Sequence, residues 1–186
     1  MKFHPTALRG AFVIEPERRE DPRGYFARTF CRDELTKVSL FGEIAQCSVS
    51  YNERRGTLRG LHFQSDPHAE EKMVACSQGA VFDVMVDLRR GSETFMQYVG
   101  QELTPDNGLA LYIPKGFAHG FVTLEDRSIV TYSISVPYVP SASAGVRWND
   151  PAIGVRWPID ASVISDRDRA LPSVAEWLRE LPPGRR

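Results

Sequence analysis

Four polar side chains lie inside short apolar stretches of the sequence, where a polar residue needs an explanation. His62 lies in TLRGLHFQ, Lys72 opens KMVACS, His119 lies in IPKGFAHGF and Tyr132 lies in SIVTYSISV. Around one cavity, such residues would supply a general base, an electrophile and a general acid, the groups that remove a proton beside a carbonyl. The simpler interpretation treats the histidines and the tyrosine as packed or surface residues and the lysine as outward-pointing.

A closed β structure would bring these stretches around one interior. Short apolar or alternating stretches predict strands at residues 44–51, 57–64, 72–77, 80–88, 94–103, 109–113, 120–124 and 128–136. Turn signals separate them, and this regular pattern is typical of an antiparallel sandwich or barrel. In the last stretch, alternation places Tyr132 on the inward face with Val130 and Ile134.

The two ends of the chain add smaller elements. Short strands are expected at 11–14 and 25–30 on either side of the turn EDPRG, followed by a helix at 33–41 with Asp33 as a possible cap. In PSVAEWLREL, Ser173 and Glu176 form a capping box at the start of the clearest helix. No linker or repeat divides the chain, so we expect one all-β domain over residues 1–186, with short peripheral helices and a C-terminal helix.

The composition excludes several classes of protein. The formal net charge of the 186 residues is -1, so no global field draws the chain to nucleic acid or to a membrane. The three cysteines form no CxxC pair, which favours a reducing compartment. The first residues lack the apolar core of a signal peptide, and no stretch is long enough for a membrane span. These features predict a cytoplasmic protein.

A partial metal-binding pattern is also present. Pro114, Gly116 and His119 are spaced P-x-G-x-x-H, similar to the second motif of the cupin superfamily. Metal-binding cupins carry H-x-H in the first motif, whereas this chain has HFQ, with Gln64 in place of the second histidine. Two histidines alone make a poor site for a divalent transition metal, and His68 lies in a polar turn. We therefore expect no metal and no cofactor.

Longer motifs extend the resemblance to a single family. DPRGYFARTF, GTLRGLHFQ, EKMVACSQGAVFDVMVDLRRGSETF, IPKGFAHGF, YSISVPYVP and WNDPAIGVRWP, in this order, resemble the dTDP-4-dehydrorhamnose 3,5-epimerases, a nucleotide-sugar branch of the cupins. The resemblance implies a jelly-roll β-barrel that pairs as a homodimer through exchanged or abutting strands. It also implies cofactor-free epimerisation at C3 and/or C5 of a nucleoside-diphosphate 4-keto-6-deoxy sugar, by default dTDP-4-dehydro-6-deoxy-D-glucose to dTDP-4-dehydro-L-rhamnose.

The same resemblance implies roles for individual residues. His62 matches the general base, Tyr132 the general acid, Asp168 the carboxylate that pairs with the histidine, and Lys72 the cation that steadies the enolate. The implied substrate contacts are His119 at the sugar, Arg23 and Arg59 at the diphosphate, Tyr138 stacking on the base, and Gln46, Ser48, Arg28 and Arg167 around the nucleotide. Arg28 stands where the family commonly has a glutamate, and Gln46-Cys47-Ser48 where it has Q-x-N, so thymidine is the default base only.

The chemistry agrees with these roles. Protons on C3 and C5 are acidic because both carbons flank the C4 ketone, and a cation beside its oxygen lowers the barrier. Inversion needs a second group on the opposite face, which Tyr132 would supply. Arginine suits phosphate oxygens, which explains Arg59 in the strand of His62. Strict alternation puts Arg59 and His62 on opposite faces, and Gly60 between them predicts a bulge.

Three alternatives remain open at this point. A related enzyme that inverts only C3, or a 3,4-ketoisomerase, would share a base such as His62 and place the acid differently. A non-catalytic sugar-binding cupin would use the same side chains only as hydrogen-bonding groups, although the match at Asp168 argues against it. A metal-dependent oxygenase or isomerase would carry near-stoichiometric metal.

Overall fold

Two antiparallel sheets form the body of the protein. The computed structural model describes residues 1–181. The first sheet has the order β1 (Lys2–Pro5), β2 (Phe12–Glu15), β10 (Ala110–Ile113), β7 (Lys72–Gln78), β12 (Ser128–Ile134) and β5 (Gln46–Asn52). The second has the order β13 (Ser143–Gly145), β6 (Thr57–Gln64), β11 (Phe117–Thr123), β8 (Val81–Asp87) and β9 (Tyr98–Leu103), and β14 (Val163–Ile164) pairs with β6. The predicted all-β jelly-roll barrel is confirmed.

The main core fills the space between the sheets. Its buried members come from strands of both layers and from the turn before β2; they are Leu8, Ala11, Val74, Cys76, Val81, Met85, Leu103, Leu111, Ile113, Phe117, Phe121 and Val130. The inward face of β12 agrees with the predicted alternation, because Val130 is fully buried and Tyr132 packs against the same cluster. Burial of these side chains on one face fixes the register of each strand.

The part of the chain that follows β12 covers the outer face of the second sheet. Leu61, Val84 and Ala118 on that face pack with Val146 and Ile153 from the loops and with Val174 from the helix α3 (Val174–Glu180). Both faces of β11 are therefore buried, which explains why no simple alternation of apolar and polar residues marks this strand in the sequence. The predicted capping box of Ser173 and Glu176 is confirmed at the start of α3.

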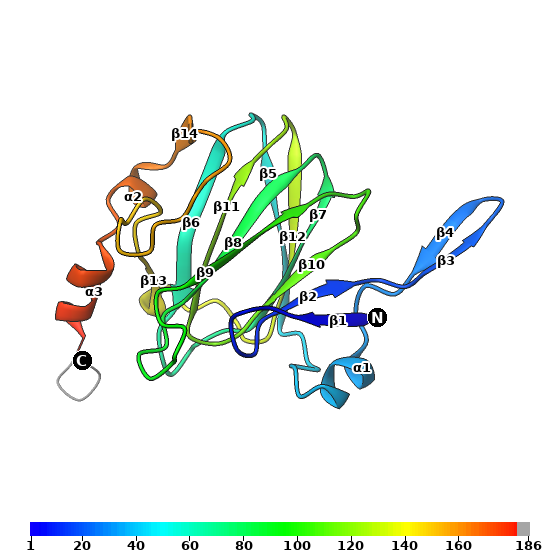
Figure 1. Cartoon of the computed structure of the whole chain (residues 1–186), viewed down its shortest axis with the longest axis horizontal. Coiled ribbons are helices and arrows are strands. Elements are labelled where there is room, and N and C mark those ends of the chain that lie inside the picture. Colours follow the sequence, from blue (N-terminus) through cyan, green and yellow to red (C-terminus); the bar gives the residue numbers. More distant parts are fainter. Residues whose placement is uncertain (182–186) are drawn as a thin grey trace.

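A hairpin of β3 (Arg18–Asp21) and β4 (Gly24–Ala27) projects from the body of the barrel (Figure 1). The strand predicted at 25–30 is shorter than expected, and the all-polar β3 was not predicted. Helix α1 (Arg32–Lys37) is shorter than the predicted 33–41, and its N-cap is Cys31 without a side-chain bond, so the prediction of Asp33 as the cap is wrong. Two short elements complete the chain, η1 (Pro140–Ala142) and α2 (Asp166–Arg169).

Within residues 1–181, none of the helices has the length and hydropathy that crossing a membrane requires.

Candidate active site

A cavity of about 470 Å³ opens between the two sheets, and we call it the barrel cavity. Its lining residues come from β5, β6, β7, β11 and β12 and from the segment around Tyr138. They are Gln46, Ser48, Ser50, Arg59, His62, Glu70, Lys72, His119, Phe121, Tyr132, Ile134 and Tyr138. The four polar residues singled out in the apolar stretches are therefore brought together. The second sheet supplies Arg59, His62 and His119, and the first supplies Lys72 and Tyr132 from the opposite wall.

His62 is oriented by a buried carboxylate. Its Nε2 lies 2.7 Å from Oδ1 of Asp168, which is only 3% exposed although it belongs to the short helix α2. Burial alone would raise the pKa of Asp168, but the hydrogen bond and charge of His62 and the backbone N–H of Gly60 hold that pKa below its usual value. Asp168 is thus an anion, to which His62 can hydrogen-bond only by donating Nε2–H. That tautomer leaves the lone pair on Nδ1, as a general base requires.

The bulge predicted at Gly60 resolves the conflict of faces in β6. The register of β6 against β11 shifts between the His62–His119 pair and the Arg59–Phe121 pair, and Gly60 has φ +133. A Cβ at Gly60 would lie 2.6 Å from Cα of Gly120, so a side chain is excluded there. The extra residue lets Arg59 and His62 both line the barrel cavity, despite their odd spacing.

A second histidine–carboxylate pair lies beside the first, and the sequence analysis missed its acidic member. Both carboxylate oxygens of Asp83 lie 2.9 Å from Nε2 of His119, and Asp83 has no exposed surface. Burial raises the pKa of Asp83, while the charges of His119 and Lys72 oppose that rise. The signal for it was an acid in the middle of the apolar stretch AVFDVMVDL, and β8 buries this acid completely.

Lys72 also has a partner that the sequence analysis missed. Its Nζ lies 2.5 Å from Oε1 of Glu70, and the two side chains are 8% and 11% exposed. The alternative of an outward-pointing Lys72 is therefore wrong. A cation in this wall faces the same space as His62, where an electrophile is needed for chemistry at a carbonyl.

Tyr132 projects from β12 with its ring edge against His119, at a centroid distance of 6.1 Å and an interplanar angle of 78°. Burial and the charge of Asp83 raise the pKa of the Tyr132 hydroxyl, and the charge of Arg59 and a hydrogen bond with Ser50 oppose this. The phenol therefore keeps its proton at neutral pH, as a general acid must.

Several of the residues predicted to contact the nucleotide lie at the mouth of the barrel cavity. Gln46 accepts a hydrogen bond from the backbone N–H of Tyr138 at 2.7 Å, and the Tyr138 ring is half exposed. Arg59 is held by Oδ1 of Asn52 at 2.8 Å from its Nε. Ser48 completes this rim on β5.

Gln64, at the position of a metal ligand in other cupins, serves the backbone instead. Its Oε1 accepts from the N–H of Val139 at 2.6 Å, and its Nε2 donates to the carbonyls of His68 and Pro137. Across the described side chains, no three His, Cys, Asp or Glu residues are grouped as ligands of one metal ion.

Three predicted contacts lie outside the barrel cavity of their own chain. Arg23 lies in the turn between β3 and β4 and pairs with Asp21 at 2.7 Å. Arg28 pairs with Glu34 at 2.6 Å. Arg167 is also bound within its own chain, because its Nη2 donates a hydrogen bond to Oγ of Ser143 at 2.7 Å.

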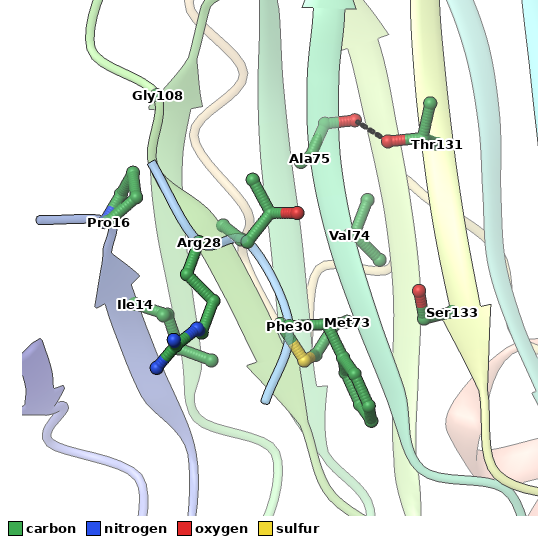
Figure 2. Close-up of a pocket in the computed structure, with 12 residues that line it drawn as sticks. Ile14, Pro16, Arg28, Phe30, Met73, Val74, Ala75, Gly108, Thr131 and Ser133 are labelled. Carbon is green, nitrogen blue, oxygen red and sulfur yellow. Dashed lines mark hydrogen bonds between the residues drawn. The ribbon is translucent and has the colours of Figure 1, made fainter. Parts of the chain in front are cut away.

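Arg28 borders a smaller hollow of about 110 Å³ on the other face of the first sheet (Figure 2). Thr131, Ser133 and Ala75 line its wall, and Thr131 donates to the Ala75 carbonyl at 3.3 Å. Thr131 and Ser133 alternate along β12 with Tyr132, which lines the barrel cavity, so the sheet separates this hollow from the barrel cavity. It holds no group that could serve as a base.

Comparison with known proteins gives one consistent result. Residues 5–176 match the family model of dTDP-4-dehydrorhamnose 3,5-epimerase. The dTDP-4-dehydrorhamnose 3,5-epimerase of Sinorhizobium fredii is 40% identical over 177 residues, which covers 95% of this chain and 91% of that protein. A crystal structure of the Bacillus anthracis dTDP-4-dehydrorhamnose 3,5-epimerase with TDP and PPi bound has a TM-score of 0.90 at 40% identity, covering 93% of this chain and 99% of that one. The dTDP-4-dehydrorhamnose 3-epimerase of Streptomyces niveus is 36% identical and covers 95% and 85%.

The resemblance inferred from the motifs is thereby confirmed over nearly the whole chain, and the match includes every strand that lines the barrel cavity. The chain belongs to the dTDP-4-dehydrorhamnose 3,5-epimerase family.

Proposed function

We propose that this protein is a cofactor-independent isomerase that epimerises C3 and C5 of dTDP-4-dehydro-6-deoxy-D-glucose to give dTDP-4-dehydro-L-rhamnose. One observation carries the proposal: a base oriented by a buried carboxylate, His62 with Asp168, faces a protonated phenol, Tyr132, across one cavity. Two acid–base groups on opposite walls are what inversion at carbon requires, and a purely binding site has no need of them.

The reaction begins with proton removal. Nδ1 of His62 takes the proton from C3 or C5, and the electron pair of the broken C–H bond moves toward C4, so that negative charge develops on the C4 oxygen. The Lys72 ammonium, in the wall of the same cavity, stabilises that charge. Asp168 stabilises the imidazolium that forms, because it remains an anion.

Reprotonation completes the inversion. The Tyr132 hydroxyl delivers its proton to the opposite face of the same carbon, the enolate electrons return to form the new C–H bond, and the C4 ketone is restored. Solvent then reprotonates the tyrosine and removes the proton from His62. Repeating the cycle at the other carbon beside C4 gives the doubly inverted sugar.

The nucleotide end is assigned to the mouth of the cavity. The Arg59 guanidinium, held in place by Asn52, is suited to the diphosphate oxygens, and the exposed ring of Tyr138 to stacking on the base. Gln46 and Ser48 would then contact the nucleoside. The dTDP nucleotide is supported by the TDP bound to the Bacillus anthracis relative.

We further propose a homodimer, in which the hairpin of one copy reaches the cavity of the other. An isolated two-stranded hairpin is barely stable in water, yet this one carries Tyr25 and Phe26 at 53% and 71% exposure. The edge strand β5 of the first sheet also exposes two large apolar side chains, Val49 and Tyr51. Docking of the hairpin on a second copy would cover this apolar surface and bring Arg23 to the diphosphate.

We also propose that Arg28 and Arg167 contact the nucleotide. Neither residue lines the barrel cavity of its own chain, so these contacts depend on the proposed homodimer. The cytoplasmic location is also a proposal. It is supported by Cys31, Cys47 and Cys76, which are free thiols in the described part of the chain.

The decisive experiment is solvent exchange followed by NMR. The purified protein and dTDP-4-dehydro-6-deoxy-D-glucose are incubated in heavy water, and deuterium is counted at C3 and C5. The proposal expects label at both carbons and a rhamno-configured product. Label at C3 alone would indicate a 3-epimerase, as in the Streptomyces niveus relative, and a 3-keto product would indicate a ketoisomerase. Tight binding without any exchange would indicate a sugar-binding cupin and overturn the proposal.

A further inference from the structure

A carboxylate holds the Lys72 ammonium inside the barrel cavity. Glu70 and Lys72 are both nearly buried, line the cavity together and join at 2.5 Å. Glu71 between them points away and accepts from the Tyr112 hydroxyl at 2.6 Å. The three residues therefore alternate as in a strand, although β7 begins only at Lys72.

The backbone fixes Glu70 in this place. The N–H of Glu71 donates to Oγ of Ser135, and the N–H of Ser135 donates to the carbonyl of Glu71, both at 3.0 Å. These bonds continue the pairing of β7 with β12 one residue beyond Ile134 and Lys72. Glu70 is thus attached to the wall that also carries Tyr132, and it cannot move away with a free loop.

A lysine in this position needs such a partner. Its four-carbon stem has many rotamers, and an ammonium that is out of water is costly unless it is paired. The pair is an ion pair at one side of the ammonium, which has three N–H donors. The same ammonium can therefore also face an oxygen that gains negative charge in front of Lys72.

We propose that Glu70 is a positioning residue for the reaction: it fixes the Lys72 ammonium at the point where the C4 oxygen becomes an oxyanion. This inference rests on the proposed function, because the oxyanion exists only if a proton is removed beside the C4 ketone. Glu70 acts through Lys72, so removing Glu70 releases the ammonium into other rotamers and weakens the stabilisation of the enolate.

The test compares Glu70→Ala with Glu70→Gln. Gln keeps a side chain of the same length with an amide oxygen beside Lys72, whereas Ala removes the contact altogether. We expect Glu70→Ala to lower kcat about 10- to 100-fold, because a misplaced group close to the reacting atoms costs up to about that much. The Gln variant should recover most of this loss, and KM should change much less than kcat in both, since the interaction with the oxyanion exists only in the transition state.

A double-mutant cycle separates positioning from a structural role. If Glu70 acts through Lys72, Glu70→Ala combined with Lys72→Ala costs no more activity than Lys72→Ala alone. Deuterium exchange should fall in step with epimerisation, because the step affected is enolate formation. Glu71→Gln is the matched control: it removes a neighbouring charge, keeps the acceptor for Tyr112 and should leave kcat near the wild-type value.

Two results would overturn the proposal. Additive losses in the double mutant would mean that Glu70 does not act through Lys72, and an unchanged kcat per folded Glu70→Ala protein would mean that the pair only stabilises the fold. Failure of the proposed function is recognised separately, because the wild-type protein would then exchange no deuterium before any variant is compared.

Discussion

His62 and His119 are directly opposed across β6 and β11, and each ring binds a buried carboxylate from another element. The two pairs differ in access. The His62 side chain is 35% exposed to the cavity, and the pKa of its partner Asp168 is lowered. The His119 side chain is 6% exposed, and burial raises the pKa of its partner Asp83. The first pair combines an accessible ring with a partner whose pKa is lowered, so we assign the base to His62. His119 shapes the wall against which the ring of Tyr132 packs.

Replacing His62 by alanine should abolish both deuterium exchange and epimerisation while leaving the fold intact. The side chain contributes little to the core, because a third of it is open to the cavity. Loss of a general base typically costs ~10²–10⁴-fold in rate. Kinetics in heavy water and the thermal midpoint Tm of the same preparation check this. Near-normal turnover in the variant would show that the base lies elsewhere.

Asp168→Asn should keep the shape of the site and remove the charge that fixes His62. The amide can present Nδ2–H to the ring and favour the wrong tautomer, so we expect kcat to fall by ~10²–10⁴-fold with a smaller change in KM. Equal kcat in the variant and the wild type would remove Asp168 from the mechanism.

The same substitution has a consequence for stability against pH. The folded-state pKa of Asp168 lies below the ordinary 3.8, so its ionised form stabilises the folded protein. This contribution is fully present above the unfolded pKa near 3.8 and is lost as the pH falls through the lower folded pKa. Between about pH 5 and pH 2, the Tm of the wild type should therefore fall more steeply than that of Asp168→Asn. Parallel curves would show that the pair has no linkage to folding.

The sequence allowed the central strands to be predicted well, because their signals are local. TLRGLHFQ lies between a turn rich in charge and a turn with proline, and β6 has the bounds predicted for it. The bulge at Gly60 was also predictable, since two functional residues of one strand had to share a face. The hairpin was harder: β3 is Arg-Arg-Glu-Asp with every residue exposed, so no apolar alternation marks it as a strand.

The partners of the proposed catalytic residues could not be predicted in the same way. Asp83 and His119 are 36 residues apart in the sequence. They meet because β8 and β11 are paired neighbours in the second sheet. Glu70 was a charge in a turn, and its burial depends on the pairing of Glu71 with Ser135. Asp168 was predicted only through the resemblance to a family. Local patterns identify which polar residues are unusual, whereas long-range register decides which of them touch.

Tyr132→Phe should separate proton removal from inversion. The substitution keeps the ring that packs on His119 and removes the hydroxyl, so the pocket survives while the acid is lost. His62 should still remove a proton and return deuterium to the same face, so that the variant labels substrate faster than it forms inverted product. We expect inversion to fall by ~10²–10⁴-fold. Inversion at the wild-type rate would make Tyr132 a packing residue.

Activity should survive exhaustive chelation. Gln64 is fully engaged with the backbone, and the residues of the barrel cavity supply base, acid and cation by themselves. Treatment with a strong chelator, followed by gel filtration and assay with and without added divalent metals, checks this. Loss of turnover that one metal restores would favour the metal-dependent alternative.

The proposed dimer makes a prediction about Arg23. If the hairpin serves the cavity of the other copy, Arg23→Ala should raise KM about 10-fold through loss of a charged phosphate contact, with a smaller effect on kcat. His62→Ala should be inactive. Each variant alone forms dimers with two defective sites, and these preparations are the controls.

Mixed dimers of Arg23→Ala with His62→Ala, made by coexpression with two different tags, distinguish the two possible arrangements. If the hairpin crosses to the other copy, the barrel with intact His62 receives Arg23 from its partner, and the other barrel lacks both residues. One site is then complete, and the mixed dimer regains the wild-type KM with one competent site in two. If the hairpin serves its own barrel, one site lacks Arg23 and the other lacks His62, so the raised KM persists. Recovery of the wild-type KM therefore requires exchange between copies, and a persistent Arg23→Ala phenotype would contradict the proposed assembly.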